Sequence, residues 1–354
     1  MKFRGHLILF LALLTGSAGA LAGGAPLTWR GDIATARGFV DAMARAFQHS
    51  GHAHVRLQPF NTISALDQLS RGQVDIAGSA RGRSPRRAIE SSLTFTPVAW
   101  DALVIVTSRH NPLRSITLKQ LHDIYYGKIH NWHQVGGRNE PIHVYAVASP
   151  TDGIEYSLRK LLFGRGNQPV AAPRLYINVR SLEQGVALDP DGMGVSTLSG
   201  VIGNPKLKTL AIDGVRPSLH NVASGRYPLY TPLYLVTRQD EHNASATAFV
   251  DFATSAAGKR VLRHHHLLPY ADGSVLANNQ ADREQQIASA VGRTANNGPT
   301  AAPGASYSEG ASSAPTSQRT RDARDRMLDK RDAQARQRKA AQRSRAMNAG
   351  ASGG

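Results

Sequence analysis

The sequence predicts an α/β protein that is large enough for two compact lobes and that ends in a basic tail. Segments with the two-residue period of strands alternate with segments that have the 3.6-residue period of helices. The chain has 354 residues, of which 41% are hydrophobic, and this is enough to build a core in each lobe. Such alternation favours parallel sheets covered by helices, in which ligands bind outside the carboxyl ends of strands at helix N-termini.

The periodic segments are expected between residues 35 and 265. The expected helices are Thr35–Gln48, Ile63–Arg71, Leu118–Tyr126, Gly153–Phe163, Leu182–Leu188, Ala244–Ala253 and Ala257–His265. The expected strands are Val55–Gln58, Asp75–Ala77, Ala102–Val106, Ile142–Ala146, Met193–Ser196, Leu207–Ile212 and Leu233–Thr237.

The first 22 residues have the pattern of a secretory signal peptide. Lys2 and Arg4 precede a short apolar run, and Ala20-Leu21-Ala22 is a small-x-small cleavage site. The run is shorter than the roughly 20 residues that a membrane-spanning helix needs. We therefore expect a periplasmic or secreted chain that begins near Gly23. The chain has no Cys, which excludes disulfides and thiolate metal sites.

The C-terminal part differs from the body in charge and composition. Residues 283–354 contain thirteen Arg and Lys against six Asp and Glu, whereas residues 23–282 contain 27 against 19. We expect a flexible linker at 283–318 and a basic, partly helical or disordered tail at 319–354. The tail is interpreted either as a solvated arm or as a segment attracted to an anionic envelope surface. Nucleic acid is a weaker candidate, because no aromatic residues interleave with the arginines.

Two framework segments carry a family resemblance. They are NPLRSITLKQLHDIYYGKIHNWHQVGG, residues 111–137, and DGVRPSLHNVASGRYPLY, residues 213–230. Together they resemble segments of the periplasmic phosphate-binding proteins of ABC transporters, which are PstS-like members of the type 2 periplasmic-binding-protein superfamily. The resemblance covers about residues 27–270. It implies an α/β, two-lobed, venus-flytrap fold, here followed by a disordered basic tail.

The resemblance also implies where the lobes begin and end. The first lobe would comprise residues 23–104 and 231–282, and the second would comprise residues 105–230. In this family a tetrahedral oxyanion is held between the lobes by backbone N–H groups at helix N-termini, by hydroxyls, and usually by one arginine.

Five residues near the expected strand ends of the first lobe are candidates for ligand binding. Thr35 is the only hydroxyl where the family has Ser and Thr opening its first helix, and its alternative role is to cap that helix. Thr62 and Ser64 open the next helix, where capping is again the alternative. Ser79 ends the strand in VDIAGSAR, which is similar to a family segment. Arg81 either supplies positive charge to the cleft or is a solvated arginine.

The most specific family signature is degenerate in this chain. It consists of an arginine followed, after three residues, by Ser-Gly-Thr, and here Ala148, Asp152 and Ile154 stand for the Arg, Ser and Thr. Only Gly153 is retained, so Asp152 and Gly153 complete the set of ligand-binding candidates. Asp152 and Glu155 also have the spacing of a capping box, which is the structural interpretation of both residues.

The degenerate signature predicts weak phosphate binding. A carboxylate beside a phosphate ion repels it by about 1 kcal/mol in water, and more in a closed cleft. A lost charge-assisted arginine bond removes roughly 1.5–3 kcal/mol more. We therefore expect an affinity about two to three orders of magnitude below that of a homologue with the full signature.

Two functional classes are favoured. The first is an exported solute-binding protein that binds phosphate or a related small anion and delivers it to an ABC permease. The alternative is a non-transport envelope sensor or adhesion module with the same fold. No GxSxG, HExxH, Walker or GxGxxG motif is present, so we expect no enzyme activity and no cofactor. We expect a monomer, and we interpret the histidines at 49–54 and 264–266 as exposed residues rather than metal ligands.

Overall fold

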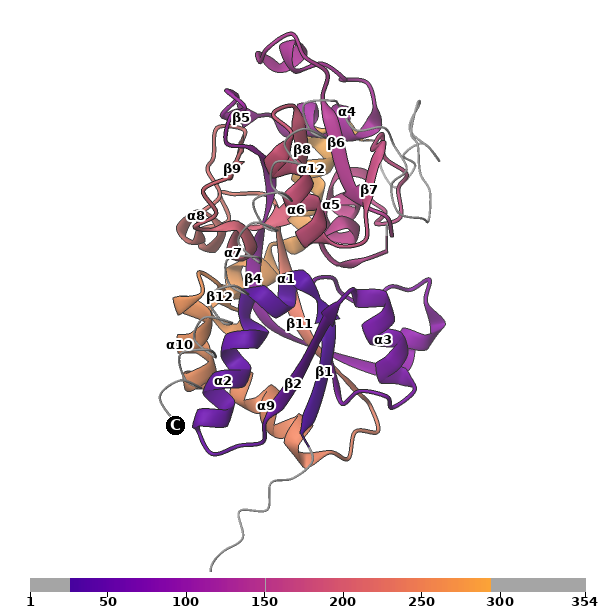
Figure 1. The fold of residues 1–354 in the computed structure, drawn as a ribbon, viewed down its shortest axis with the longest axis vertical. Helices are drawn as coiled ribbons and strands as arrows, with labels where there is room; N and C mark the ends of the chain where they lie inside the picture. Colours follow the sequence, from indigo (N-terminus) through magenta and orange to yellow (C-terminus); the bar gives the residue numbers. More distant parts are fainter. Residues whose placement is uncertain (1–25, 150, 294–354) are drawn as a thin grey trace, which may run out of the picture.

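The computed structural model describes residues 26–149 and 151–293, which form two lobes stacked along the long axis of the molecule (Figure 1). A single sheet runs through both lobes in the strand order β2-β1-β3-β11-β4-β8-β6-β7. Its strands are β1 (Leu27–Asp32), β2 (Val55–Phe60), β3 (Ile76–Ser79), β4 (Leu93–Ser108), β6 (His143–Val147), β7 (Arg174–Tyr176), β8 (Gly192–Thr197) and β11 (Tyr230–Arg238).

Strand β4 joins the two lobes. Its first part, from Leu93 to Ala102, pairs antiparallel with β11 of the first lobe. Its second part, from Leu103 to Thr107, pairs antiparallel with β8 of the second lobe. Every residue from Val98 to Ser108 is buried, so the strand passes between the lobes without a solvated break. The exact lobe boundaries, at 104/105 and 230/231, stay predictions.

In the first lobe, strand ends and helix N-termini face the second lobe. Strands β1, β2 and β3 are parallel, and the helices that follow β1 and β2 start at the edge of the sheet nearest the second lobe. The helical elements of this lobe, with one short strand, are α1 (Ile33–Thr35), η1 (Ala36–Val40), α2 (Asp41–His49), α3 (Thr62–Ser70), η2 (Ala88–Ser92), α9 (Ala244–Thr254), α10 (Ala256–His264), β12 (Leu268–Pro269) and η4 (Tyr270–Gly273).

The second lobe places helix α5 opposite this edge. Strands β6, β7 and β8 are parallel, and α5 begins shortly after β6 ends. The other elements follow the same α/β pattern on shorter segments. They are β5 (Ser115–Ile116), α4 (Leu118–Tyr126), η3 (Trp132–Val135), α5 (Gly153–Phe163), α6 (Val179–Leu188), α7 (Leu198–Val201), β9 (Leu207–Thr209), β10 (Ala211–Ile212) and α8 (Leu219–Ala223).

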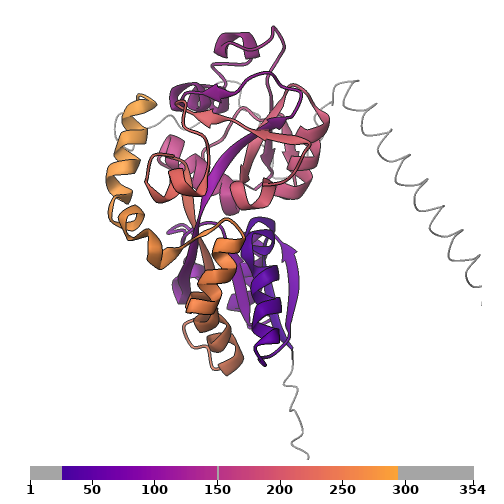
Figure 2. The ribbon, with the colours of Figure 1, turned by 90° about the vertical axis from the view of Figure 1, so that its left-hand side faces the viewer.

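The chain also crosses between the lobes near its described end. Helices α11 (Ser274–Asn278) and α12 (Gln280–Ala290) leave the first lobe, and α12 packs against α5 and α4 of the second (Figure 2). Arg283 and Ile287 are buried in this contact. Residues 283–293 therefore do not begin the flexible linker predicted there. The periodicity missed this helix because Ile287 is its one large apolar residue.

The predicted helices and strands are all present, with two kinds of difference. The segment Leu207–Ile212 forms two short strands, β9 and β10, rather than one, and the segment Thr35–Gln48 is divided among α1, η1 and α2. Further elements were not expected, because most are too short to show a period. They are β1, β5, β7, β12, α7, α8, α11, α12, η2, η3 and η4. The predicted signal peptide and basic tail lie outside the described residues. None of the helices in residues 26–149 and 151–293 combines the length and the hydrophobicity of a membrane-spanning segment.

We predict that α12 contributes to the stability of the fold. Replacing buried Ile287 with Ala should lower the free energy of unfolding by about 2–5 kcal/mol, because it leaves a cavity under the helix. The exposed Ser289 of the same helix is the control, and Ser289→Ala should change stability by less than about 0.5 kcal/mol. Urea unfolding measures both. Equal, small effects would show that α12 is not docked in solution.

Candidate functional site

The candidate site lies where β1 and β3 of the first lobe end against the start of α5 in the second. It contains Asp32, Thr35 and Thr62 from the first lobe and Asp152 and Gly153 from the second. The two carboxylates are buried, with 5% of Asp32 and 6% of Asp152 exposed. Two acidic groups therefore share an interior position, and how they are satisfied determines what the site can do.

The carboxylate of Asp32 accepts hydrogen bonds from three different segments of the first lobe. Its Oδ1 atom accepts from the Thr35 backbone N–H at 2.8 Å and lies 3.1 Å from the Thr35 hydroxyl. Its Oδ2 atom accepts from the Thr62 hydroxyl at 2.9 Å and from the Ala80 backbone N–H at 2.7 Å. Asp32 thus accepts hydrogen bonds from donors that the end of β3 and the starts of α1 and α3 direct toward one point.

The carboxylate of Asp152 reaches across from the second lobe to the N-terminus of α3. Its Oδ1 atom accepts from the Thr62 backbone N–H at 2.6 Å. An amide in the first turn of a helix has no partner within the helix, and the helix dipole favours a negative charge there. Asp152 therefore bonds to the first lobe in the way that an anion bound between the lobes would.

Burial raises the pKa values of both carboxyl groups. For Asp32, loss of solvent outweighs the hydrogen bonds from Thr35, Ala80 and Thr62, and its pKa is raised. For Asp152, loss of solvent and the nearby charge of Asp32 together raise the pKa to about 7. Two carboxyl groups in contact with the same residue do not readily both ionise, so near neutral pH the pair holds a proton.

Little room remains between the lobes at this point. The cavity lined by Asp32, Asp152 and Gly153 has a volume of about 10 Å³, which is space for roughly one water molecule. Gly153 has φ of +30°, and a Cβ atom there would lie 3.4 Å from the Thr62 hydroxyl and 3.5 Å from Asp32 Oδ2. The structure is therefore a closed one in which carboxylates fill the site.

Other polar contacts between the lobes agree with a closed arrangement. Arg37 of η1 forms an ion pair of 2.7 Å with Glu183 of α6. Asp101 of β4 accepts from both the backbone N–H and the hydroxyl of Ser199, in α7. The Ser157 hydroxyl of α5 donates to the Ala80 carbonyl at 2.9 Å. Opening the lobes must break such contacts in addition to those of Asp152.

The structure brings four of the seven predicted ligand-binding residues together and separates three from them. Thr35, Thr62, Asp152 and Gly153 form the cluster with Asp32. The Ser79 hydroxyl points back to the chain and donates to the Arg81 carbonyl at 2.7 Å. The Ser64 hydroxyl accepts from Arg30 Nε at 2.9 Å and makes no contact with either carboxylate. Whether any of the seven binds a ligand stays a prediction.

Arg81 is neither solvated nor available to the cleft. It is completely buried and pairs with Glu90, at 2.6 Å and 2.9 Å for its two terminal nitrogens. Its Nε atom donates to the Thr151 carbonyl of the second lobe at 2.8 Å. The sequence interpretation missed Glu90, which lies nine residues away on the short helix η2 and neutralises the arginine.

The predicted capping roles are wrong at three places. Asp32, rather than Thr35, caps α1, and Asn61, rather than Thr62 or Ser64, caps α3. The Asp152 side chain makes no bond to its own helix. Glu155 does not complete a capping box, because it accepts from the Val147 N–H at 3.0 Å and pairs with Arg159.

Asp32 is the residue of the cluster that sequence reasoning missed. It lies in the segment 31–36, where the resembled family has small and hydroxyl residues, and a carboxylate in that place was the available signal. No group of three or more His, Asp or Glu side chains in residues 26–149 and 151–293 is arranged to hold a metal ion.

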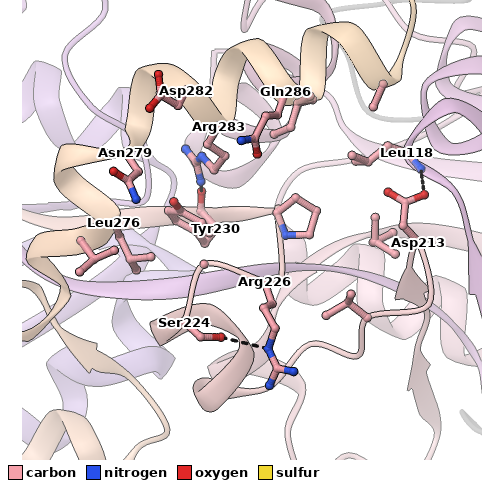
Figure 3. A pocket seen from close by; sticks show the side chains of 17 residues that line it. Leu118, Asp213, Ser224, Arg226, Tyr230, Leu276, Asn279, Asp282, Arg283 and Gln286 are labelled. Carbon is pink, nitrogen blue, oxygen red and sulfur yellow. Dashed lines mark hydrogen bonds between the residues drawn. The ribbon is translucent and has the colours of Figure 1, made fainter.

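Larger pockets lie away from the cluster. One, of about 440 Å³, lies under α12, and Figure 3 shows the side chains that line it. Arg226, Arg283, Asp213 and Asp282 line this pocket, so cations and anions around it are equal in number. Arg283 points to Tyr230 and donates to its carbonyl at 2.8 Å.

Comparison with known proteins identifies the family. A family model described as a PBP superfamily domain matches residues 17–257. The chain belongs to the PBP superfamily. Protein SphX of Synechococcus elongatus is 30% identical over 239 residues, which are 62% of this chain and 70% of that protein. The phosphate-binding protein PstS of Borreliella burgdorferi is 25% identical over 197 residues, which are 52% of this chain and 68% of that protein.

A solved structure supports the architecture of this PBP superfamily member. An ABC-type phosphate transport receptor from Vibrio cholerae is 26% identical, with a TM-score of 0.54, and the match covers 68% of this chain and 99% of that one. The predicted two-lobed α/β fold is thus confirmed.

We predict that the shared proton makes folding stability depend on pH. The pKa of Asp152 is about 7 in the folded state, against a value of 3.8 for an unperturbed aspartate, so the folded state binds more protons. The free energy of unfolding therefore falls as pH rises between these two values. Asp152→Asn should lessen this fall between about pH 4 and about pH 7. Urea unfolding over that range, with exposed Asp41→Asn as the control, measures the difference. Parallel pH curves for the wild type and Asp152→Asn would contradict it.

Proposed function

We propose that this protein is an exported solute-binding protein that binds phosphate, or a related small oxyanion, between its lobes. The single observation that carries the proposal is the convergence of donors on the cluster. The backbone N–H groups of Thr35, Thr62 and Ala80, with the hydroxyl of Thr62, all point to carboxylate oxygens. An oxyanion presents the same acceptor atoms as a carboxylate, so it can take over these donors.

In this proposal, Asp152 is exchanged for the ligand when the lobes open. Its bond to the Thr62 amide is the contact at the cluster that links the two lobes directly. Separation of the lobes withdraws Asp152 from α3 and leaves that amide for the ligand. Asp32 lies on the same lobe as its donors, and in this proposal it gives up the Ala80 amide to the ligand and accepts a hydrogen bond from a protonated ligand oxygen.

Phosphate suits a site with carboxylates better than a fully deprotonated oxyanion does. Near neutral pH phosphate carries at least one proton, which it can donate to Asp32, whereas sulfate has none to donate. Repulsion between phosphate and Asp152 is smallest when Asp152 is protonated. Its pKa of about 7 makes this state accessible at neutral and mildly acidic pH. No arginine takes part in the cluster, since Arg81 is paired with Glu90.

The names of two relatives support the proposal. They are a phosphate-binding protein and an ABC-type phosphate transport receptor. By this likeness we propose that the protein delivers its ligand to an ABC permease, without catalysis and without a cofactor. The signal-peptide pattern of residues 1–22 supports a place outside the cytoplasm.

We predict that phosphate binding is weak and is limited by the charge of Asp152. At about pH 8, Asp152→Asn should raise the affinity for phosphate about tenfold, because it removes one unit of repulsion. At about pH 5 the gain should be smaller, because Asp152 is then protonated in the wild type. Calorimetry measures the phosphate affinity of both proteins at each pH. The ratio of the two affinities at one pH removes the effect of phosphate's own titration.

Asp41→Asn is the matched control, since it removes a carboxylate that is exposed on α2. Its affinity should equal that of the wild type at both values of pH. Sub-micromolar binding by the wild type that Asp152→Asn leaves unchanged would show that Asp152 does not face the ligand. If no variant binds phosphate at either pH, the proposed ligand is wrong.

A further inference from the structure

A second pocket between the lobes has a strongly positive wall. It has a volume of about 340 Å³, within the range of pockets that hold small organic molecules. One side is the loop 82–86 after β3 together with β11, and the other is α5 with the turn that follows it. Helix α12 contributes Gln280, Arg283 and Glu284. None of the residues of the Asp32–Asp152 cluster lines this pocket.

Five cationic side chains line the pocket, and one anionic side chain does. The cations are Arg83, Arg86, Lys160, Arg165 and Arg283, and the anion is Glu284. Glu284 lies 3.6 Å from Lys160, so it offsets one charge of the five. The remaining positive charges come from the first lobe, the second lobe and α12, which places them on different sides of the pocket.

Two of these arginines have N–H groups that lack an acceptor. Arg86 is exposed and makes no hydrogen bond or ion pair with any described residue. Arg283 is 93% buried, and its Cζ atom lies 3.7 Å from the centre of the Tyr230 ring. Its Nε atom has no hydrogen-bond partner among the described residues. A buried guanidinium N–H without an acceptor is unfavourable. Arg283 lines both this pocket and the pocket under α12, so an anion in either pocket can supply an acceptor.

The shape of the pocket indicates an anion larger than the ion proposed for the cluster. Its volume is about 340 Å³, against about 10 Å³ at Asp32 and Asp152. Guanidinium groups on several sides favour a ligand with more than one phosphate group, because each group can take paired N–H donors. The hydroxyls of Tyr156 and Tyr234 belong to side chains that line the same space.

We propose that this pocket binds a small anion of the diphosphate or triphosphate class and that the bound anion stabilises the closed arrangement of the lobes. The pocket walls belong to both lobes, so its complete set of cations is assembled only when the lobes are closed. A ligand that binds the closed state better than the open one shifts the equilibrium toward closure. The proposal does not depend on phosphate binding at the cluster.

Calorimetry of the full mature chain with inorganic pyrophosphate tests the proposal. The wild type should show saturable binding with one site, weakened by added salt because the contact is ionic. Arg86→Ala should weaken the binding at least about tenfold, and Arg86→Ala combined with Lys160→Ala should weaken it further. Both side chains are exposed, so these variants should fold, and circular dichroism checks that they do.

The control is Arg180→Ala, which removes an exposed arginine from a different pocket, beside α6. It changes the net charge as much as Arg86→Ala does, and it should leave pyrophosphate binding within about twofold of the wild type. Pyrophosphate should also raise the melting temperature of the wild type and of Arg180→Ala, but not of the double variant.

Two results would overturn the proposal. One is the absence of saturable pyrophosphate binding by the wild type, and the other is an equal loss in Arg86→Ala and Arg180→Ala. Titration of Arg86→Ala with orthophosphate distinguishes this pocket from the Asp32–Asp152 cluster. The affinity of this variant for orthophosphate should equal that of the wild type. If the proposed phosphate site at the Asp32–Asp152 cluster is wrong, orthophosphate binding should instead be absent in every variant.

Discussion

The structure depends on the need of buried amide groups for an acceptor. The end of β3 and the starts of α1 and α3 direct the N–H groups of Ala80, Thr35 and Thr62 into the space between the lobes. A buried N–H without a partner costs about as much as a lost hydrogen bond. The fold must therefore place hydrogen-bond acceptors at this point, and in the closed chain Asp32 and Asp152 provide them.

This way of satisfying the amides has an electrostatic consequence. Carboxylates bring negative charge into an interior with little solvent, burial raises the pKa of both, and the charge of Asp32 raises the cost of ionising Asp152 further. The charge of Arg81 lowers the pKa of Asp152 in part, but its guanidinium group is paired with Glu90 and makes no hydrogen bond to either carboxylate. Proton uptake is a further way to relieve the negative charge, so ligand exchange and protonation are linked in the same group of atoms.

Much of the fold could be predicted from the sequence, because long amphipathic segments and the framework motifs reflect local rules. Helices α4 and α5 have the bounds that periodicity gives, and α4 is capped by Thr117 and Gly127 as those residue types favour. Helix α12 was missed because one buried Ile and a buried Arg make no recognisable stripe. Its place is decided by contacts with α5 and α4 that are distant in the sequence.

The candidate site was only partly predictable, for a related reason. Thr35, Thr62, Asp152 and Gly153 were found because they lie at strand ends or helix starts. The role of Asp32 was missed, since a carboxylate before a helix is explained by capping alone, and its bonds to Thr62 and Ala80 join residues 30 and 48 positions apart. The pair Arg81–Glu90 likewise requires the path of a loop that no periodic pattern describes.

The central claim is that carboxylates of the chain occupy donors that an anion can take over. A crystal structure of the mature protein grown with saturating phosphate tests it most directly. The account predicts phosphate oxygens accepting from the N–H groups of Thr62 and Ala80, with the Asp152 side chain moved away from α3. Phosphate bound elsewhere, with both amides still bonded to Asp152 and Asp32, would contradict it.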